Sequence, residues 1–339
     1  INFDLISLIE NNNTILFKNL NLSKDFKLIN IDSFNFNYLN NKQVKNQLLL
    51  KKINSNYNIV GESFDATKLI NKILDSDDTN SSLFHNLNSK ITLKINKTYI
   101  DEINFINKLS GVLSFKNNKI DNLNLVSTFP NNKKVNLTVK INEKKEKITK
   151  FFTDYPKPLI KRYDFINGFE EGFLVYQSVK KDETSNGLLT IENFKIREVP
   201  SFAKLLSLAS LQGMADLLTG EGIRFNDFEM KFSNKNKLTT IDEMYATGPA
   251  VSILMDGYIE TDKLISLRGT LVPATTINRT IASIPLLGNI LVGKKTGEGV
   301  FGVSFKVKGT PKNLETTVNP IKTLTPRFIT RTLENIKKN

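Results

Sequence analysis

The sequence predicts a mainly β protein: an elongated, curved antiparallel β-sheet that forms a repeating β-groove and carries a few short helices. Three observations predict this fold class. Apolar residues alternate with polar ones in many short segments, turn residues recur between these segments, and helical patterns are few. The expected helices cannot cover a sheet of this size. Either the sheet closes on itself, or its apolar face stays open to a ligand.

Period-two alternation gives each expected strand one apolar and one polar face, as in antiparallel sheets with one face in water. Thr138 and Lys140 separate the apolar residues of the segment 137–141, and Ser304 and Lys306 separate those of the segment 301–307. The same pattern occurs at 34–38, 91–95 and 228–232. Turn signals follow at 117–118, 130–132, 142–147 and 234–236. We therefore expect a β meander.

Helical signals divide the chain. Asp65 can cap a short helix near 66–74, with Leu69, Ile70, Ile73 and Leu74 on one face. An apolar helix occupies 199–222 and ends at its two glycines. The expected organisation is an N-terminal part of the sheet over 1–150, a continuation over 151–198, the apolar helix 199–222 and a C-terminal β region over 223–339. This last region holds a helical segment, 276–292, broken at Pro285, and a tail helix after Pro326.

The formal net charge of +13 favours either anionic partners or a bias in composition. Lysines are scattered along the chain without a dense basic run, and Lys, Asn and Ile are abundant throughout, as an AT-rich genome would give. Surfaces that read bases or clamp phosphates tend to use arginine, which is scarce here. We therefore expect no nucleic-acid partner.

No residue set in the sequence favours an enzyme. Cysteine is absent, and the single histidine, His85, lies in an Asn-rich stretch without a nucleophile turn. The segment 288–294 imitates a phosphate-binding loop, but Lys295 stands where the loop needs Ser or Thr. The acidic run 75–80 lacks the Gly and Glu of a calcium loop. We expect no catalytic residues, no metal and no other cofactor.

The last part of the chain carries a series of landmarks in a fixed order. They are Val272-Pro273, Asn278, Ile284-Pro285-Leu286-Leu287-Gly288, Gly297-Glu298-Gly299, the strand 301–307 and Asn319-Pro320. Upstream, Ala246 to Ala250, Gly257, the segment 200–222 and Gly61 to Asp65 add weaker ones. This pattern resembles the C-terminal region of the AsmA-like family of bacterial envelope proteins. The resemblance is strong over residues 185–325, and it departs from the family at Pro326-Arg327, where Pro-Gly is expected.

The resemblance implies a non-enzymatic periplasmic protein, anchored in the inner membrane by a segment upstream of Ile1. Such a protein assists phospholipid transport between the inner and outer membranes, or maintains the outer membrane, and has other envelope proteins as partners. Acyl chains would lie along the apolar face of the sheet. Burial contributes about 0.8 kcal/mol per CH₂, so a lipid does not cross water unaided at useful rates.

The alternative function is a structural or assembly factor for outer-membrane protein biogenesis, which would pair exposed sheet edges with partner strands. Lipid bound along the sheet favours the first function, and bound polypeptide favours the second.

Two apolar segments are candidates for sealing or gating a lipid groove. The helix 202–218 is apolar nearly all round, so it is either a core helix or a gate. The patch around Pro285 either dips into a membrane interface or packs under the sheet. Candidate residues of the groove and its gate are Leu137, Val139, Ile141, Phe202, Leu205, Leu206, Leu208, Leu211, Leu217, Leu218, Ile284, Leu286, Leu287, Ile290, Leu291, Phe301, Val303, Phe305 and Val307.

Overall fold

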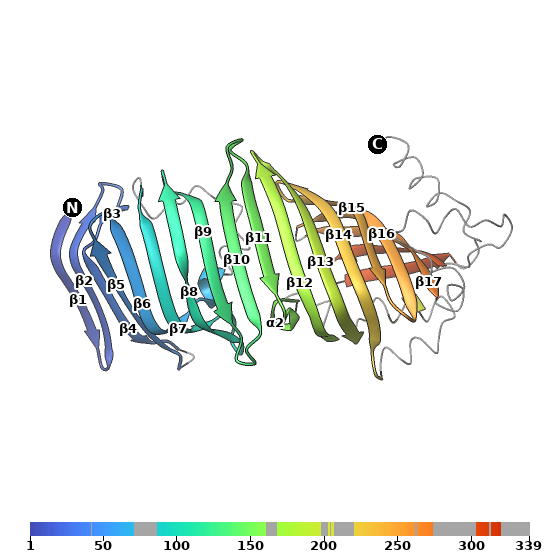
Figure 1. The fold of residues 1–339 in the computed structure, drawn as a ribbon, viewed down its shortest axis with the longest axis horizontal. Coiled ribbons are helices and arrows are strands. Elements are labelled where there is room, and N and C mark those ends of the chain that lie inside the picture. Colours follow the sequence, from blue (N-terminus) through green and yellow to red (C-terminus); the bar gives the residue numbers. More distant parts are fainter. Residues whose placement is uncertain are drawn as a thin grey trace. The chain divides into compact units, whose positions relative to one another are not determined.

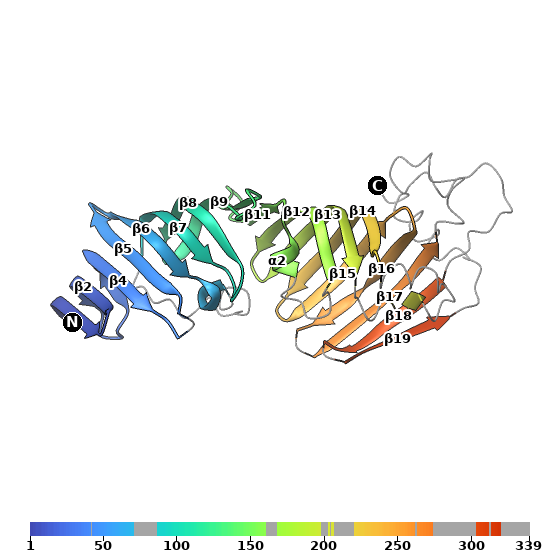
Figure 2. The ribbon, with the colours of Figure 1, turned by 90° about the horizontal axis from the view of Figure 1, so that it is seen from below.

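The computed structural model describes residues 1–41, 43–70, 87–160, 168–197, 203, 205–206, 220–261, 263–273, 303–311 and 313–319. Over these ranges the chain forms 19 strands of one open, mostly antiparallel sheet, and its helical segments are short (Figures 1 and 2). The predicted fold class, a mainly β protein with a groove-like sheet, is confirmed. The expected helices over 276–292 and after Pro326, and most of the helix 199–222, lie outside the described residues.

The chain divides into two compact units. The first comprises Ile1–Tyr155 and Val175–Glu183, and the second comprises Pro156–Leu174 and Thr184–Asn339. The strands of the first unit are β1 (Asn2–Glu10), β2 (Asn13–Leu22), β3 (Leu28–Asn30), β4 (Ser33–Leu39), β5 (Lys45–Ile53), β6 (Asn56–Asp65), β7 (Lys90–Tyr99), β8 (Phe105–Lys116), β9 (Lys119–Thr128), β10 (Lys134–Ile141) and β11 (Lys147–Thr153). The second unit holds α2 (Lys157–Ile160), β13 (Thr184–Arg197), β14 (Ile223–Lys235), β15 (Leu238–Thr247), β16 (Val251–Glu260), β17 (Leu264–Pro273), β18 (Val303–Thr310) and β19 (Asn313–Asn319), while β12 (Gly168–Lys181) contributes to both.

Tight turns build the meander where the sequence predicts them. Asn117 and Asn118 join β8 to β9 with φ of 49° and 64°, the left-handed pair that a type I′ hairpin turn needs. The turns expected at 130–132 and 142–147 also lie between successive strands. The last expected turn is displaced slightly, because β14 continues to Lys235 and β15 begins at Leu238.

One pair of neighbours in the first unit departs from the expected antiparallel meander. β6 and β7 are parallel, with Tyr57 opposite Ile91 and Asp65 opposite Tyr99. A parallel pair needs a crossover connection, and this one starts with a helical turn at 67–70. The carboxylate of Asp65 accepts a hydrogen bond from the backbone N–H of Thr67 at 3.0 Å, so Asp65 caps the helix as predicted. Ile73 and Leu74 lie outside the described residues.

Several strands break the strict alternation at a left-handed, non-glycine residue. Asn19 in β2 has φ of 50° and Asn193 in β13 has φ of 53°. Around Asn193 the buried side chains are Ile191 and Phe194, which are three residues apart instead of two. The alternation shifts by one residue at Asn193, while β13 stays in register with β14, where Glu192 is opposite Asp227 and Phe194 is opposite Phe225.

The second unit has a well-buried core. Phe169, Phe194 and Phe225 stack with ring centroids 5.4 and 5.3 Å apart. Leu271 and Val303, directly opposite each other on β17 and β18, are almost fully buried. Many apolar side chains of this unit are therefore buried.

Candidate functional site

In the first unit, apolar residues line up across the sheet in rows that run from strand to strand. Residues directly opposite each other on neighbouring strands share a face, so each row lies on one side of the sheet. The central row consists of Ile6, Phe17, Phe34, Leu50, Ile59, Leu93, Gly111, Leu125, Leu137 and Phe151, one from each of ten strands. With neighbouring strands about 4.8 Å apart, the nine gaps give this row a length of roughly 43 Å along the sheet.

Two shorter rows flank the central one, and we call the three rows together the apolar face. One flanking row is Leu8, Ile15, Phe36, Leu48, Gly61, Ile95 and Leu109, and the other is Tyr57, Ile91, Leu113, Leu123, Val139 and Thr149. Phe34 lies 4.8 Å from Phe17 and 5.7 Å from Phe36 between ring centroids, and Phe36 lies 5.9 Å from Tyr38. Aromatic side chains have few rotamers, and these rings pack against each other, so we expect little side-chain motion in this part of the apolar face.

The apolar face is only partly covered. Every residue of its central row is half-buried: none is sealed in a core and none is fully exposed. A small buried cluster, formed by Leu20, Ile31, Tyr57 and Leu87, packs against part of the face. The corresponding residues of the second unit, such as Val303 at 2% and Phe305 at 4% exposure, are sealed. The two units therefore differ in how far their apolar side chains remain accessible.

The opposite side of the first sheet carries both polar and apolar residues, and one row across it includes Leu16, Leu49, Val60, Val126 and Phe152. Asn35, Lys94, Asn124 and Lys140 occupy positions that alternate with the rows, and all four are exposed. Exposed polar residues therefore occur on this side, but the two sides are separated less strictly than the period-two pattern predicts.

Lys147 is a cation beside the apolar face. Lys147 in β11 is directly opposite Ile141 in β10, which is exposed and continues the apolar alternation of Leu137 and Val139. Burial, together with the positive charge of Lys180, lowers the pKa of Lys147. An anionic group placed here would relieve the repulsion between the two lysines.

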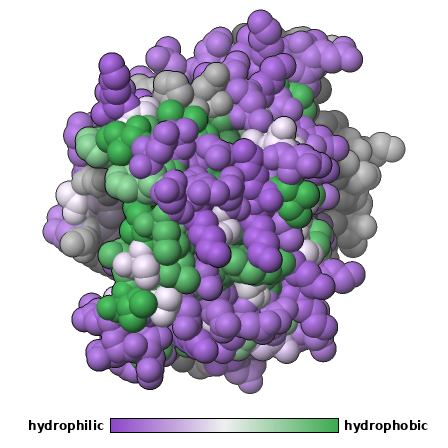
Figure 3. Space-filling model, turned by 90° about the vertical axis from the view of Figure 1, so that its left-hand side faces the viewer, coloured by the Kyte–Doolittle hydropathy of each residue, from purple (hydrophilic) through white to green (hydrophobic). Residues whose placement is uncertain are grey.

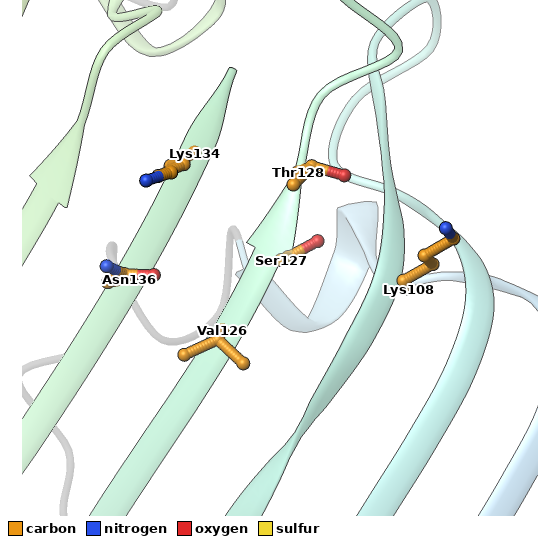
Figure 4. Close-up of a pocket in the computed structure, with 6 residues that line it drawn as sticks. All are labelled: Lys108, Val126, Ser127, Thr128, Lys134 and Asn136. Atoms are coloured by element: carbon orange, nitrogen blue, oxygen red, sulfur yellow. The ribbon is translucent and has the colours of Figure 1, made fainter. Parts of the chain in front are cut away.

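A shallow depression on β8–β10 does not form a convergent site (Figure 4). Lys108 and Lys134 stand on either side of β9, and their side chains point away from each other. The hydroxyl of Ser127 donates to the backbone carbonyl of Asn107 at 2.7 Å, so its proton is already engaged. The depression is lined by Lys108, Val126, Ser127, Thr128, Lys134 and Asn136.

Charged groups of the second unit form ion pairs both within a strand and between neighbouring strands. Lys231 contacts Glu229 at 3.1 Å and Glu243 at 3.7 Å, and Arg268 contacts Asp256 at 2.8 Å. Burial and the nearby carboxylates, led by Glu229, raise the pKa of Tyr245 to about 12, so its phenol stays protonated at neutral pH. Lys231 and Arg268 are therefore held in ion pairs.

Comparisons of the chain with protein-family models, with curated proteins and with solved structures found no match. In the part of the chain that the structure describes, no three His, Asp or Glu side chains come together as a metal site. Over the same part, no helical segment has the length and apolar character to cross a membrane. His85, the one histidine, lies outside the described residues.

The structure distributes the predicted groove residues between the two units. Leu137 and Val139 belong to the apolar face, and Ile141 lies beside it. Leu205, Leu206, Val303 and Phe305 are buried in the second unit, and Val307 is half-buried there. Outside the described residues lie Phe202, Leu208, Leu211, Leu217, Leu218, Ile284, Leu286, Leu287, Ile290, Leu291 and Phe301.

Sequence reasoning did not select most of the central row. Phe17, Leu50, Ile59, Leu125 and Phe151 are ordinary members of alternating segments, and nothing in their local sequence marks them. The cross-strand register is the missing signal. Hairpin turns set this register locally, but the parallel pairing of β6 with β7 fixes it between the two halves of the row.

Proposed function

We propose that this chain binds phospholipids by placing their acyl chains along the apolar face of the first unit. The observation that carries the proposal is the central row, whose residues span ten strands and all remain half-buried. Each acyl CH₂ removed from water there contributes about 0.8 kcal/mol, so a path of this length suits a long hydrocarbon chain. If these rows were fully buried, their side chains would contribute only to packing and could not contact a ligand.

The proposed mechanism is physical and needs no catalytic residue or cofactor. The acyl chains contact the apolar side chains, while the headgroup remains at the wet rim. Lys147 and Lys180 supply positive charge near Ile141, where a phosphate would be attracted. A lipid that moves from strand to strand keeps its apolar surface covered at every step, which lowers the barrier that water imposes.

The resemblance to the AsmA-like family supplies the cellular part of this proposal. The chain acts in the bacterial periplasm, in a protein anchored to the inner membrane. There it assists phospholipid transport between the inner and outer membranes and so maintains the outer membrane, alongside other envelope proteins.

Site-specific photo-crosslinking tests the proposal. A benzophenone side chain at Phe34, Leu50 or Leu137, all in the central row, should capture phospholipid from vesicles of phosphatidylethanolamine and phosphatidylglycerol. The matched positions are Asn35, Lys51 and Lys140, which are exposed neighbours on the polar side and should give little adduct. Mass spectrometry of the adducts separates the outcomes. Equal labelling of both sides, or no lipid adduct at the central row, would overturn the proposal.

A further inference from the structure

The side of the first sheet opposite the apolar face carries charges of one sign in three rows of residues. Along each strand, the members of these rows alternate with residues of the apolar face. One row runs from Lys18 to Lys150 and one from Leu16 to Phe152, and a shorter one runs from Lys90 to Ile148. We call these rows the lysine face. Their charged members are all exposed, none is Asp or Glu, and they are Lys18, Lys51, Lys90, Lys94, Lys140 and Lys150.

Two further lysines extend the lysine face at the hairpin between β8 and β9. Lys116 and Lys119 are directly opposite each other, and both are exposed. Phe115 packs against the buried cluster beside the apolar face, so the alternation turns the next residue, Lys116, toward the lysine face. Like charges directly opposite each other are destabilising, and an anion that contacts both would relieve the repulsion.

Among the described residues, no ion pair neutralises the charge of the lysine face. The ion pairs between described residues belong to the second unit, such as Arg224 with Glu171 at 2.9 Å. Two carboxylates on the strands of the face, Glu62 and Asp121, lie at register shifts outside the three rows. Composition alone would also place acidic residues among these lysines, since the chain has 34 Asp and Glu against 47 Lys and Arg.

Apolar side chains lie between the lysines. Val60 and Val126 are 39% and 44% exposed, and the shallow depression beside Val126 and Asn136 gives the face a concave point (Figure 4). Hydrophobic and hydrophilic residues also share the surface at the β1 end of this unit (Figure 3). Protein interfaces combine apolar contacts with polar and charged surroundings, and the lysine face offers both.

The lysine face is large enough for a protein partner. With strands about 4.8 Å apart and rows on one side about 7 Å apart, the face measures roughly 38 Å by 20 Å. Its area is therefore on the order of 700 Å², close to the roughly 800 Å² that each partner buries in a standard interface.

We propose that the lysine face binds an acidic surface of another protein, whose carboxylates contact the lysines and whose apolar side chains contact Val60 and Val126. A second copy of the chain carries the same lysines, so two such faces would repel each other. The proposal does not rest on the proposed lipid function, because it uses the other side of the sheet.

Two other anionic partners fit the face less well. Sheets that bind single-stranded nucleic acid stack bases on aromatic rings, and Phe152 is the one aromatic residue in the three described rows. Anionic bilayers are bound most firmly when apolar side chains enter the interface. Val60 and Val126 lie within strands among longer lysine side chains, so they do not project far enough to enter it.

Charge reversal tests the proposal, with fluorescently labelled poly-L-glutamate as the acidic probe and the full chain as the protein. The triple variant Lys51→Glu, Lys94→Glu, Lys140→Glu should weaken binding by roughly tenfold or more, because close charge pairs across an interface couple strongly. The corresponding triple Gln variant removes the charges without adding carboxylates. It should give a smaller loss, and it serves as the test if the Glu variant does not fold.

The matched control reverses three exposed lysines in turns of the same unit, Lys24→Glu, Lys133→Glu and Lys144→Glu. It changes the net charge equally and should keep most of the binding. Equal loss in both triple variants would reveal a nonspecific effect of net charge and overturn the proposal. Tighter binding of a DNA duplex or of phosphatidylglycerol vesicles than of poly-L-glutamate, lost in the lysine-face variant, would assign the face to that partner instead.

Photo-crosslinking in cells identifies the natural partner. A benzophenone side chain at Val60 or Val126 should capture a protein that mass spectrometry identifies as acidic. The purified partner should bind the full chain and the turn variant, and it should bind the lysine-face variant more weakly. A captured protein that binds all three chains equally, or the absence of any captured protein, would contradict the proposal.

Discussion

At two positions of the second unit, an aromatic ring occupies the space that a side chain would need, and both positions are glycine. Gly269 is opposite Phe305 and Gly187 is opposite Phe232. A Cβ on Gly187 would lie 2.4 Å from the ring of Phe232. A Cβ on Gly269 would meet the ring of Phe305 at 2.7 Å and also the carbonyl oxygen of Leu254 at 2.4 Å. Close packing, not a left-handed backbone, is the reason for glycine at both positions.

These contacts predict different costs for the same substitution. Gly269→Ala should lower the free energy of unfolding by about 1–3 kcal/mol, since overpacking strains a filled core and the Leu254 carbonyl is held in the ladder. Gly187→Ala should cost less, because the clash there is with a side chain that can rotate. Urea denaturation of both variants measures the difference. Equal costs would show that the backbone contact is not decisive.

Lys147 predicts a dependence of stability on pH. Its pKa is lowered in the folded chain, first by burial and then by Lys180, so the unfolded chain holds the proton more tightly. Folding stability should therefore rise as pH increases from the folded pKa toward the ordinary value of 10.5. Lys147→Met should raise the melting temperature at pH 7 and remove this alkaline rise. Lys150→Met, on the polar side of the same strand, is the control and should do neither.

At the scale of the elements, local sequence predicts strands and turns well and fails at irregularities. Alternation locates β10 and β18, and the Asn117-Asn118 pair locates a hairpin. The left-handed Asn193 is invisible to a period-two pattern, because it shifts the phase of the alternation without changing the composition. Alternation also cannot distinguish a sealed apolar face from an open one. Val303 and Leu137 occupy equivalent positions in their patterns, yet only Val303 is buried.

The left-handed residue in β13 can be tested with a substitution at two positions. Asn193→Val should destabilise the second unit by about 1–2 kcal/mol, because Asn tolerates the left-handed region through local hydrogen bonds of its side chain, which branched Val cannot make. Asn186→Val, at an exposed position of the same strand without a positive φ, should be neutral or slightly stabilising. Thermal unfolding checks both. A neutral Asn193→Val would mean that the backbone relaxes there.

At the scale of the whole molecule, the two units assign different roles to similar side chains. Phe225 is sealed at 1% exposure in the second unit, whereas Phe34 is half-buried in the apolar face of the first. Whether a phenylalanine packs in a core or stays accessible to a ligand depends on how much of its side of the sheet is covered. That covering comes from residues far apart in the sequence.

This contrast predicts that substitutions in the second unit mainly lower stability, whereas substitutions in the apolar face of the first unit mainly lower lipid capture. Phe225→Ala should cost about 3–5 kcal/mol and leave lipid capture by the folded fraction intact. Phe34→Ala should cost less and reduce lipid capture at Leu50, its cross-strand neighbour. Denaturation curves and crosslinking yields on the same samples report both effects. Loss of capture in both variants to the same degree would contradict the separation.

The parallel pairing of β6 with β7 has a consequence for the order of folding. Most pairings of the first unit join strands separated by a short turn, and they can form as soon as two neighbouring segments meet. Tyr57 and Ile91, in contrast, close a loop of 34 residues before their contact contributes anything. We expect β1–β6 and β7–β11 to form as separate meanders and the β6–β7 pairing to join them last, since non-local contacts form slowly. The continuous central row would then exist only after that final closure.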